Sequence, residues 1–154
     1  MSDDATILET HTGERLRLRT DGASRGNPGP AAAGVVVESD EGETLYSIGL
    51  YLGEMPNNQA EYRALIMGRR AVAEFQPNAV DVFMDSELVV RQMTGAYRVR
   101  DAILQQLYRE AMALVQTLPR VTFTHVRRAE NALADQLANQ ALDRHKHAAR
   151  QRSG

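Results

Sequence analysis

Hydrophobic and polar residues alternate along the first third of the chain. Leu16 and Leu18 alternate with arginines at 15, 17 and 19, which is typical of a strand with one polar face. Residues 33–38 contain three consecutive valines, and residues 44–52 alternate again, so both segments are predicted to be strands. A turn at 40–42 separates them. The pattern therefore predicts a three-stranded antiparallel meander.

The segment 21–30 between the first two predicted strands is interrupted by glycine and proline. These residues favour turns over regular structure. We therefore expect the first strand to end at Asp21 and an irregular loop to follow it.

The periodicity changes after residue 57. Apolar residues recur every three or four positions, which predicts helices at 58–75, 86–93, 101–117 and 130–143. Between them, 80–84 and 121–126 are rich in β-formers and are predicted to be strands. The expected order after the meander is α-β-α-α-β-α. It predicts an α/β fold with one five-stranded mixed sheet, whose later strands are parallel and joined by right-handed crossovers.

The length of 154 residues corresponds to one domain. We expect a flexible N-terminal segment at 1–14, a folded domain at 15–143 and a basic, disordered tail at 144–154.

Composition excludes several classes of function. Cysteine is absent, which excludes disulfides, thiolate metal sites and cysteine nucleophiles. The chain lacks a long apolar run and an apolar signal region, so no membrane association is expected and a cytoplasmic location follows by elimination. The absence of a coiled-coil stripe predicts a monomer.

Charge is unevenly distributed along the chain. Residues 1–90 hold 15 acidic and 7 basic residues, whereas residues 91–154 hold 5 acidic and 11 basic residues. A basic half suits phosphate groups, and an acidic half could meet them if a divalent cation neutralised it. Chance variation along the chain explains the asymmetry equally well.

Four carboxylates stand at positions that suggest chemistry. Asp21 is expected at the end of the first strand, Asp85 follows the strand at 80–84, and Glu61 and Asp135 lie early in two helices. Because ligand sites in open sheets gather at strand ends, neighbouring first and fourth strands would bring Asp21 and Asp85 together. The two helix starts could add Glu61 and Asp135.

Each carboxylate also has a simpler explanation. Glu61 could complete a capping box with Asn58, and Asp85 could cap the following helix. Asp135 could interact with a helix dipole, and Asp21 could be a turn residue. Taken together, however, four clustered carboxylates would repel one another unless cations lay between them. Oxygen ligands without cysteine select Mg²⁺ or Mn²⁺, and two such ions can support phosphoryl displacement.

Four sequence blocks, in order, resemble the type 1 ribonuclease H family. They are residues 20–29 (TDGASRGNPG), 57–62 (NNQAEY), 84–86 (MDS) and 125–135 (HVRRAENALAD). The resemblance extends from about Leu16 to Leu142. It implies the family's fold, a five-stranded mixed sheet with helices packed on it, in agreement with the element order above.

The resemblance also implies an activity: endonucleolytic hydrolysis of the RNA strand of RNA–DNA hybrids, leaving 5′-phosphate and 3′-hydroxyl ends. It implies that Asp21, Glu61, Asp85 and Asp135 are the catalytic carboxylates, which bind two Mg²⁺ ions, with Mn²⁺ as a possible substitute.

Further residues are assigned by the same resemblance. His125 matches a mobile histidine that assists proton transfer or product release. The substrate-binding positions are Gly22, Asn27, Asn57 and Asn58. An amide side chain can both donate to and accept from the 2′-hydroxyl that distinguishes RNA from DNA. The simpler explanations are a strand-end histidine without a role, and turn or cap chemistry for the asparagines.

The sequence departs from the family pattern at three places. Pro56 stands where many members carry Thr or Ser, and Glu87 stands where many carry Gln. The connection at 95–100 is much shorter than the basic protrusion of some bacterial members. These changes predict weaker hybrid binding, partly offset by Arg98, Arg100 and the basic tail.

Two alternatives to a hybrid-cleaving enzyme stay open. One is a non-catalytic hybrid- or RNA-binding module, against which the complete acidic set argues, because unneutralised carboxylates weaken phosphate binding. The other is a nuclease of the same fold with another substrate, such as duplex RNA or a DNA junction. Fold alone does not separate these.

Overall fold

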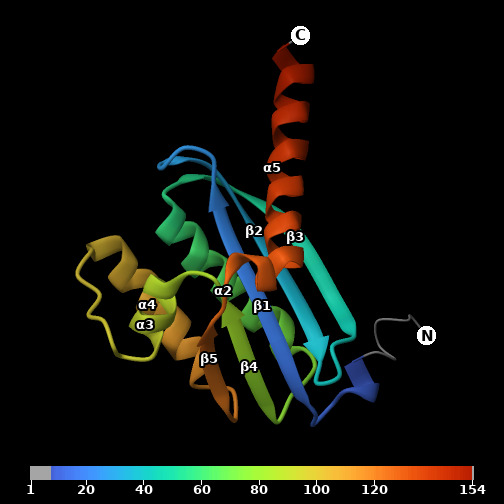
Figure 1. The fold of residues 1–154 in the computed structure, drawn as a ribbon. Coiled ribbons are helices and arrows are strands. Elements are labelled where there is room, and N and C mark those ends of the chain that lie inside the picture. Colours follow the sequence, from blue (N-terminus) through green and yellow to red (C-terminus); the bar gives the residue numbers. More distant parts are fainter. Residues whose placement is uncertain (1–7, 154) are drawn as a thin grey trace.

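Five strands form one mixed sheet in the order β3-β2-β1-β4-β5 (Figure 1) in the computed structural model, which describes residues 8–153. The strands are β1 (Arg15–Ser24), β2 (Gly29–Ser39), β3 (Thr44–Met55), β4 (Ala79–Met84) and β5 (Val121–His125). β1 to β3 are antiparallel neighbours, while β4 lies parallel to β1 and β5 parallel to β4. The predicted meander, the parallel later strands and the α/β class are confirmed.

Helices cover both faces of the sheet (Figure 1). They are α2 (Asn57–Ala73), α3 (Glu87–Met93), α4 (Ala102–Val115), the 3₁₀ turn η1 (Arg128–Asn131) and α5 (Ala132–Ser153). α2 packs on β1 and β2 and against α4, while α5 packs on the opposite face over β2, β3 and β1. The result is a three-layer helix–sheet–helix arrangement.

The main core lies between the sheet and α2, α3 and α4. Leu16 and Leu18 point into it from β1 and are fully buried. On the other face of β1, Arg15 pairs with Asp81 at 2.7 Å and Arg19 pairs with Glu38 at 2.6 Å. The alternation seen in the sequence thus separates the core face of β1 from its charged face.

The segment predicted to be an irregular loop is mostly strand, which corrects the expectation. β1 continues through Asp21 to Ser24, and β2 already begins at Gly29. Glycine is tolerated here because α2 approaches the strand closely: a Cβ on Gly22 would overlap the backbone of Ala60 and Glu61. Asp21 therefore lies inside β1, paired with Gly34 of β2 and one residue beyond the last pair of the β1–β4 ladder.

The predicted disordered tail is also wrong for residues 144–153, because α5 continues to Ser153. The residues there are mostly good helix formers. The extension is tied to the sheet by a parallel ring stack of His145 on Tyr51, with centroids 3.6 Å apart, and by a hydrogen bond from Arg144 to the Gly49 carbonyl.

Residues 8–14 contact the folded domain, although they were predicted to be flexible. Leu8 packs against the main core, and the Gly13 amide donates to the Gln76 carbonyl at 2.9 Å. The remainder of the predicted flexible segment, 1–7, lies outside the described residues. Within 8–153, no helix has both the length and the apolar character needed to cross a membrane.

Candidate metal-binding active site

Two carboxylates come from adjacent parallel strands. Thr20 of β1 lies opposite Met84 of β4, so the next residues, Asp21 and Asp85, lie side by side. Asp85 directly follows β4, as predicted. The N-cap of α3 is Ser86, whose hydroxyl accepts from the Val89 amide, so Asp85 is not used as the helix cap.

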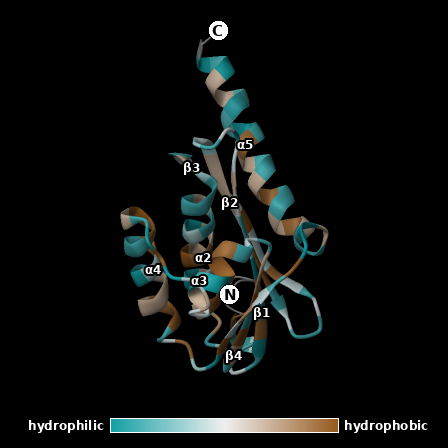
Figure 2. Cartoon of the chain, turned by 60° about the vertical axis from the view of Figure 1, so that its left-hand side comes forward, coloured by the Kyte–Doolittle hydropathy of each residue, from teal (hydrophilic) through white to brown (hydrophobic). Residues whose placement is uncertain are grey.

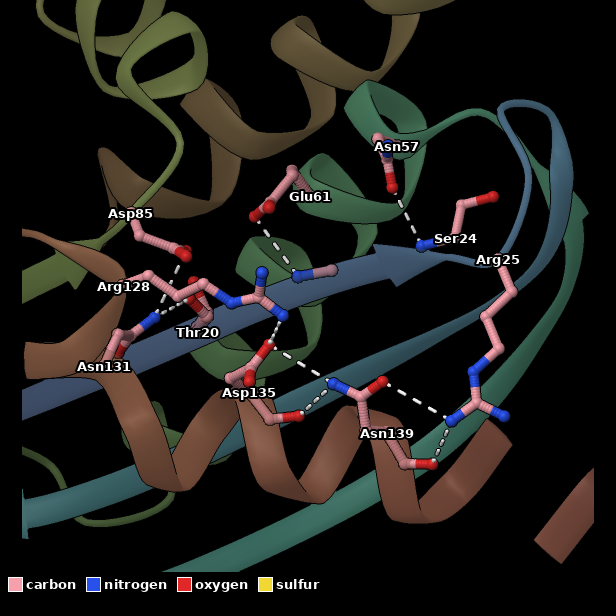
Figure 3. A network of polar contacts seen from close by, with 11 residues as sticks. Thr20, Ser24, Arg25, Asn57, Glu61, Asp85, Arg128, Asn131, Asp135 and Asn139 are labelled. Carbon is pink, nitrogen blue, oxygen red and sulfur yellow. Dashed lines mark hydrogen bonds and ion pairs between the residues drawn. The ribbon is translucent and has the colours of Figure 1, made fainter. Parts of the chain in front are cut away.

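Glu61 reaches the same place from the second turn of α2. Its Oε2 accepts a hydrogen bond from the Gly22 amide at 3.2 Å (Figure 3). The N-cap of α2 is Pro56, without a side-chain cap, so the capping box considered for Asn58 and Glu61 does not form. Glu61 is instead directed toward β1.

Asp21, Glu61 and Asp85 converge on one point. Each offers one carboxylate oxygen, and these oxygens all lie within 4.8 Å of one another. Residues 24 to 64 positions apart in sequence thus share a space of the size that a cation with oxygen ligands occupies.

Asp135 joins the group from the first turn of α5, on the other face of the sheet. Its position depends on a close approach between α5 and β2: a Cβ on Gly34 would overlap the Ala134 carbonyl. Gly34 is also the β2 partner of Asp21. Asp135 therefore lies beside Asp21, close enough to affect its pKa, but it is not one of the three residues with mutually close oxygens.

The site holds more negative charge than its surroundings stabilise. Burial, with the nearby charges of Asp85 and Asp135, raises the pKa of Asp21 to about 8. Burial also raises the pKa of Glu61 well above its usual range, helped by Asp21 and Asp85 and opposed by the Gly22 amide. Without a cation, the site retains protons at neutral pH.

The donor set fits a divalent cation. Asp21 is only 4% exposed, and among the described residues its Oδ2 is buried without a hydrogen-bond partner. A buried, unpartnered carboxylate oxygen is costly unless a proton or a cation satisfies it. All of the candidate ligands are oxygens, which suits Mg²⁺ or Mn²⁺.

Asn131 was not singled out from the sequence, yet it supports the site. It is 1% exposed, and its Nδ2 donates to the Thr20 carbonyl at 2.9 Å and to Asp85 Oδ1 at 3.4 Å (Figure 3). One amide thus joins η1, β1 and the residue after β4. The only sequence signal was its place inside the closing block at 125–135.

The carboxylates line a pocket with a volume of about 290 Å³. Arg25, Arg128 and Asn139 line this carboxylate pocket as well. Arg128 donates to Asp135 at 3.2 Å, and Arg25 contacts both the carbonyl and the side chain of Asn139. Figure 3 shows the Arg128 side chain reaching in among the carboxylates toward Asp135, and Arg25 farther away beside Asn139. These cations were missed because isolated basic residues carry no spacing signal.

The predicted substrate-binding asparagines connect the β1–β2 loop to α2. Asn27 Oδ1 accepts from the Asn57 amide at 3.0 Å, and Asn57 Oδ1 accepts from the Ser24 amide at 2.8 Å. Asn57 also lines the pocket, whereas Asn58 is half-buried beside it in the first turn of α2. Turn and cap chemistry is therefore part of the role of Asn27 and Asn57.

His125 lies at the end of β5, opposite Met84 and thus one residue from Asp85 in the ladder. It is exposed, and it is not among the residues that line the carboxylate pocket. The structure therefore places the backbone of His125 next to the site without bringing its ring into the pocket.

A buried carboxylate cluster beside two parallel strands, with arginines and amides around it, forms a candidate metal site with oxygen ligands. The chain matches the family described as reverse transcriptase-like over residues 19–141.

Relatives narrow the assignment further. The chain is 42% identical to ribonuclease HI of Halobacterium salinarum, covering 92% of this chain and 71% of that protein. It is 31% identical to ribonuclease H of Bordetella pertussis, covering 85% of this chain and 91% of that protein. By contrast, it spans only 36% of the bifunctional protein Rv2228c of Mycobacterium tuberculosis, to which it is 42% identical.

Solved structures agree with the fold. The crystal structure of RNase H1 from Halobacterium salinarum matches with a TM-score of 0.82 and 44% identity over 84% of this chain and 98% of that one. LC11-RNase H1, solved in complex with an RNA/DNA hybrid, matches with a TM-score of 0.80 and 40% identity over 84% of this chain and 97% of that one. This chain belongs to the ribonuclease H family.

Proposed function

We propose that this protein hydrolyses the RNA strand of RNA–DNA hybrids endonucleolytically, leaving 5′-phosphate and 3′-hydroxyl ends. The observation that carries the proposal is the convergence of Asp21, Glu61 and Asp85 within 4.8 Å in a chain of the ribonuclease H family. The hybrid bound to LC11-RNase H1, a relative at 40% identity, supports the choice of substrate.

Asp21, Glu61, Asp85 and Asp135 would hold two Mg²⁺ ions, with Mn²⁺ as a substitute. When bound, these ions supply activation of a water for in-line attack and stabilisation of the departing 3′ oxygen. The residues around them keep the ligands in place: the Gly22 amide orients Glu61, and the Asn131 amide orients Asp85.

Substrate binding would use the groups at the rim of the site. Asn57 and Asn58, at the start of α2, would exchange hydrogen bonds with RNA 2′-hydroxyls. Asn27 holds the β1–β2 loop against Asn57 and so shapes that edge. Gly22 allows the backbone of β1 to lie close to α2 and to substrate.

His125 would receive or deliver a proton as the product leaves. Its place at the end of β5 lets the ring approach from solvent once substrate is bound. This role, the monomeric state and the cytoplasmic location stay predictions.

The deciding experiment compares three substrates: a labelled RNA–DNA hybrid, duplex RNA and duplex DNA. Each is incubated with protein below substrate concentration in Mg²⁺, in Mn²⁺ and in chelator. We expect multiple-turnover cleavage of the hybrid's RNA strand that requires a cation, and loss of cleavage in Asp21→Asn. Stoichiometric binding without turnover would instead indicate a non-catalytic module, and preferred cleavage of duplex RNA or DNA would indicate another nuclease.

The Asp21→Asn variant also tests the site itself. Asn has nearly the same shape as Asp, so the fold should persist even though residue 21 is buried in β1 rather than exposed at a loop edge. Near-wild-type hydrolysis by a correctly folded Asp21→Asn protein would contradict the metal-ligand role.

A further inference from the structure

The outer half of α5 carries a concentration of positive charge. Beyond Asp143, the helix holds Arg144, Lys146, Arg150 and Arg152 and no acidic residue. Figure 1 shows this part of α5 projecting past the sheet beside the β1–β2 connection, and Figure 2 shows it as predominantly hydrophilic. The helix dipole favours the cations of the last turn, Arg150 and Arg152, but it does not explain Arg144 and Lys146, which lie further from the helix end.

A groove lies between this part of α5 and the β1–β2 connection. It has a volume of about 740 Å³ and is lined by Arg25, Pro30, Leu142, His145, Lys146, Ala149 and Arg150. Lys146 and Arg150 are one helical turn apart and lie on the same side of α5 as Leu142. Basic side chains thus surround a floor formed by Pro30, Leu142 and Ala149.

Arg25 belongs to both this groove and the carboxylate pocket. It bridges to α5 through Asn139 and through an ion pair with Asp143 at 2.6 Å. Asp143 is the single acidic residue of α5 beyond Asp135, so the groove remains net positive after it is counted. The basic groove is therefore a continuation of the proposed active site.

We propose that this groove binds the sugar–phosphate backbone of the hybrid several base pairs away from the cleaved bond. Lys146 and Arg150 contact phosphates, and the apolar floor faces the sugars. Continuity with the catalytic pocket favours nucleic acid as the occupant over an acidic protein. The inference rests on the proposed nuclease function, since the duplex in the pocket is what extends along α5.

Helix geometry gives the distance. Lys146 and Arg150 follow Asp135 by 11 and 15 residues along α5, which corresponds to about 16 and 22 Å. With a rise of about 3.4 Å per base pair, the value for DNA, a duplex lying along α5 would meet these side chains about five to seven base pairs from the scissile phosphate. The groove thus supplies positive charge that the short connection at 95–100 does not.

The test uses two double variants of the full chain. Lys146→Ala with Arg150→Ala removes two charges from the groove. Arg120→Ala with Arg152→Ala removes two charges outside it, since Arg120 is exposed before the start of β5, at the end of that strand away from the carboxylates. Affinity for a labelled hybrid is measured by fluorescence anisotropy in chelator over a series of salt concentrations. Thermal unfolding verifies that both variants are folded.

We expect the groove variant to lose hybrid affinity on the order of tenfold at about 0.1 M salt, and its salt slope to fall by about two. The control variant should lose clearly less. Equal losses in the two variants, or none in the groove variant, would overturn the proposal. Unchanged hybrid affinity with lost binding to polyglutamate would assign the groove to an acidic protein and would also overturn it.

Kinetics separate this inference from the proposed function. Hybrids with four ribonucleotides are compared after the duplex is shortened to three base pairs on one side of the ribonucleotides or on the other. In Mg²⁺, the groove variant should have a higher KM than the wild-type protein and the same kcat. Shortening the duplex on the side that reaches the groove should abolish this difference in KM, whereas shortening it on the other side should leave the difference unchanged. A KM difference that is the same for every substrate would overturn the inference, whereas absence of cleavage by the wild-type protein would reject the nuclease function instead.

Discussion

The carbonyl of Ala134 lies so close over Gly34 that any β-carbon at position 34 would overlap it. Gly34 is paired with Asp21 in the sheet, and Ala134 precedes Asp135 in α5. One residue without a side chain therefore sets the separation between two of the acidic groups of the site.

Replacement of Gly34 by alanine should displace the start of α5 from the sheet. We expect a loss of about 1–3 kcal/mol in the free energy of unfolding, as for other overpacked positions, and a loss of cleavage larger than instability explains. Chemical denaturation and hydrolysis rates measure the two effects. Thr44→Ala, at the exposed start of β3, is the control and should stay within about 0.5 kcal/mol. A fully active, equally stable Gly34→Ala protein would refute this account.

Protein stability should depend on pH in a direction set by the buried acids. Because the folded state raises the pKa of Asp21 from its ordinary 3.8 to about 8, it keeps a proton that the unfolded chain releases. In chelator, the free energy of unfolding should therefore decrease as pH rises from about 4 to about 8. The slope is up to about 1.4 kcal/mol per pH unit for each retained proton.

Urea unfolding between pH 5 and 8.5 in chelator measures this slope, and Asp21→Asn should reduce it. Stability that increases with pH over this range in the wild-type protein would show that Asp21 is ionised in the folded state. Addition of Mg²⁺ at pH 7 should release protons, because cation binding requires ionised carboxylates. Calorimetry in buffers of different ionisation enthalpy detects that release.

Asn131 should be required for both stability and turnover. Asn131→Ala leaves the buried Thr20 carbonyl without its hydrogen bond and should cost about 1–3 kcal/mol. It also frees Asp85, so kcat should fall. Asn131→Asp preserves the size but replaces the donor by a further negative charge, and it should be more damaging in chelator than in Mg²⁺. Wild-type kcat in Asn131→Ala would exclude a positioning role.

Arg128 should compete with cations for Asp135. Its ion pair with Asp135 is 3.2 Å long, and the Arg128 side chain is 75% exposed, so its loss should change stability by less than about 1 kcal/mol. Arg128→Ala should lower the Mg²⁺ concentration needed for half-maximal activity. Arg127→Ala, the neighbouring cation, is the matched control. A higher Mg²⁺ requirement in Arg128→Ala would instead assign Arg128 to phosphate binding.

Local periodicity was sufficient to predict the sheet and most helices, because each element buries one regular face. It failed at Asp21–Ser24, where glycine reads as a turn signal although Gly22 serves a close strand–helix contact. It failed again at 144–153, where a hydrophilic helix is held by the Tyr51–His145 stack. Both errors concern contacts between residues far apart in sequence.

The acidic residues of the site could be predicted from their positions next to strand ends and helix starts. The distances between their carboxylate oxygens could not be predicted from the sequence. Asn131 and Arg25 act through partners in other elements, and nothing in their immediate sequence indicates a bond to Thr20 or to Asn139. The position of the His125 ring could not be predicted from the sequence either. Strand pairing places its backbone beside Asp85, but its side chain is exposed to solvent.

Helix α5 begins at the carboxylates and ends at Ser153, 18 residues beyond Asp135, or about 27 Å away at the regular helical rise. A dye attached at its far end would therefore stand at a fixed span from the catalytic centre. Energy transfer from that dye to acceptors on either end of a bound hybrid would reveal which way the two strands run across the enzyme.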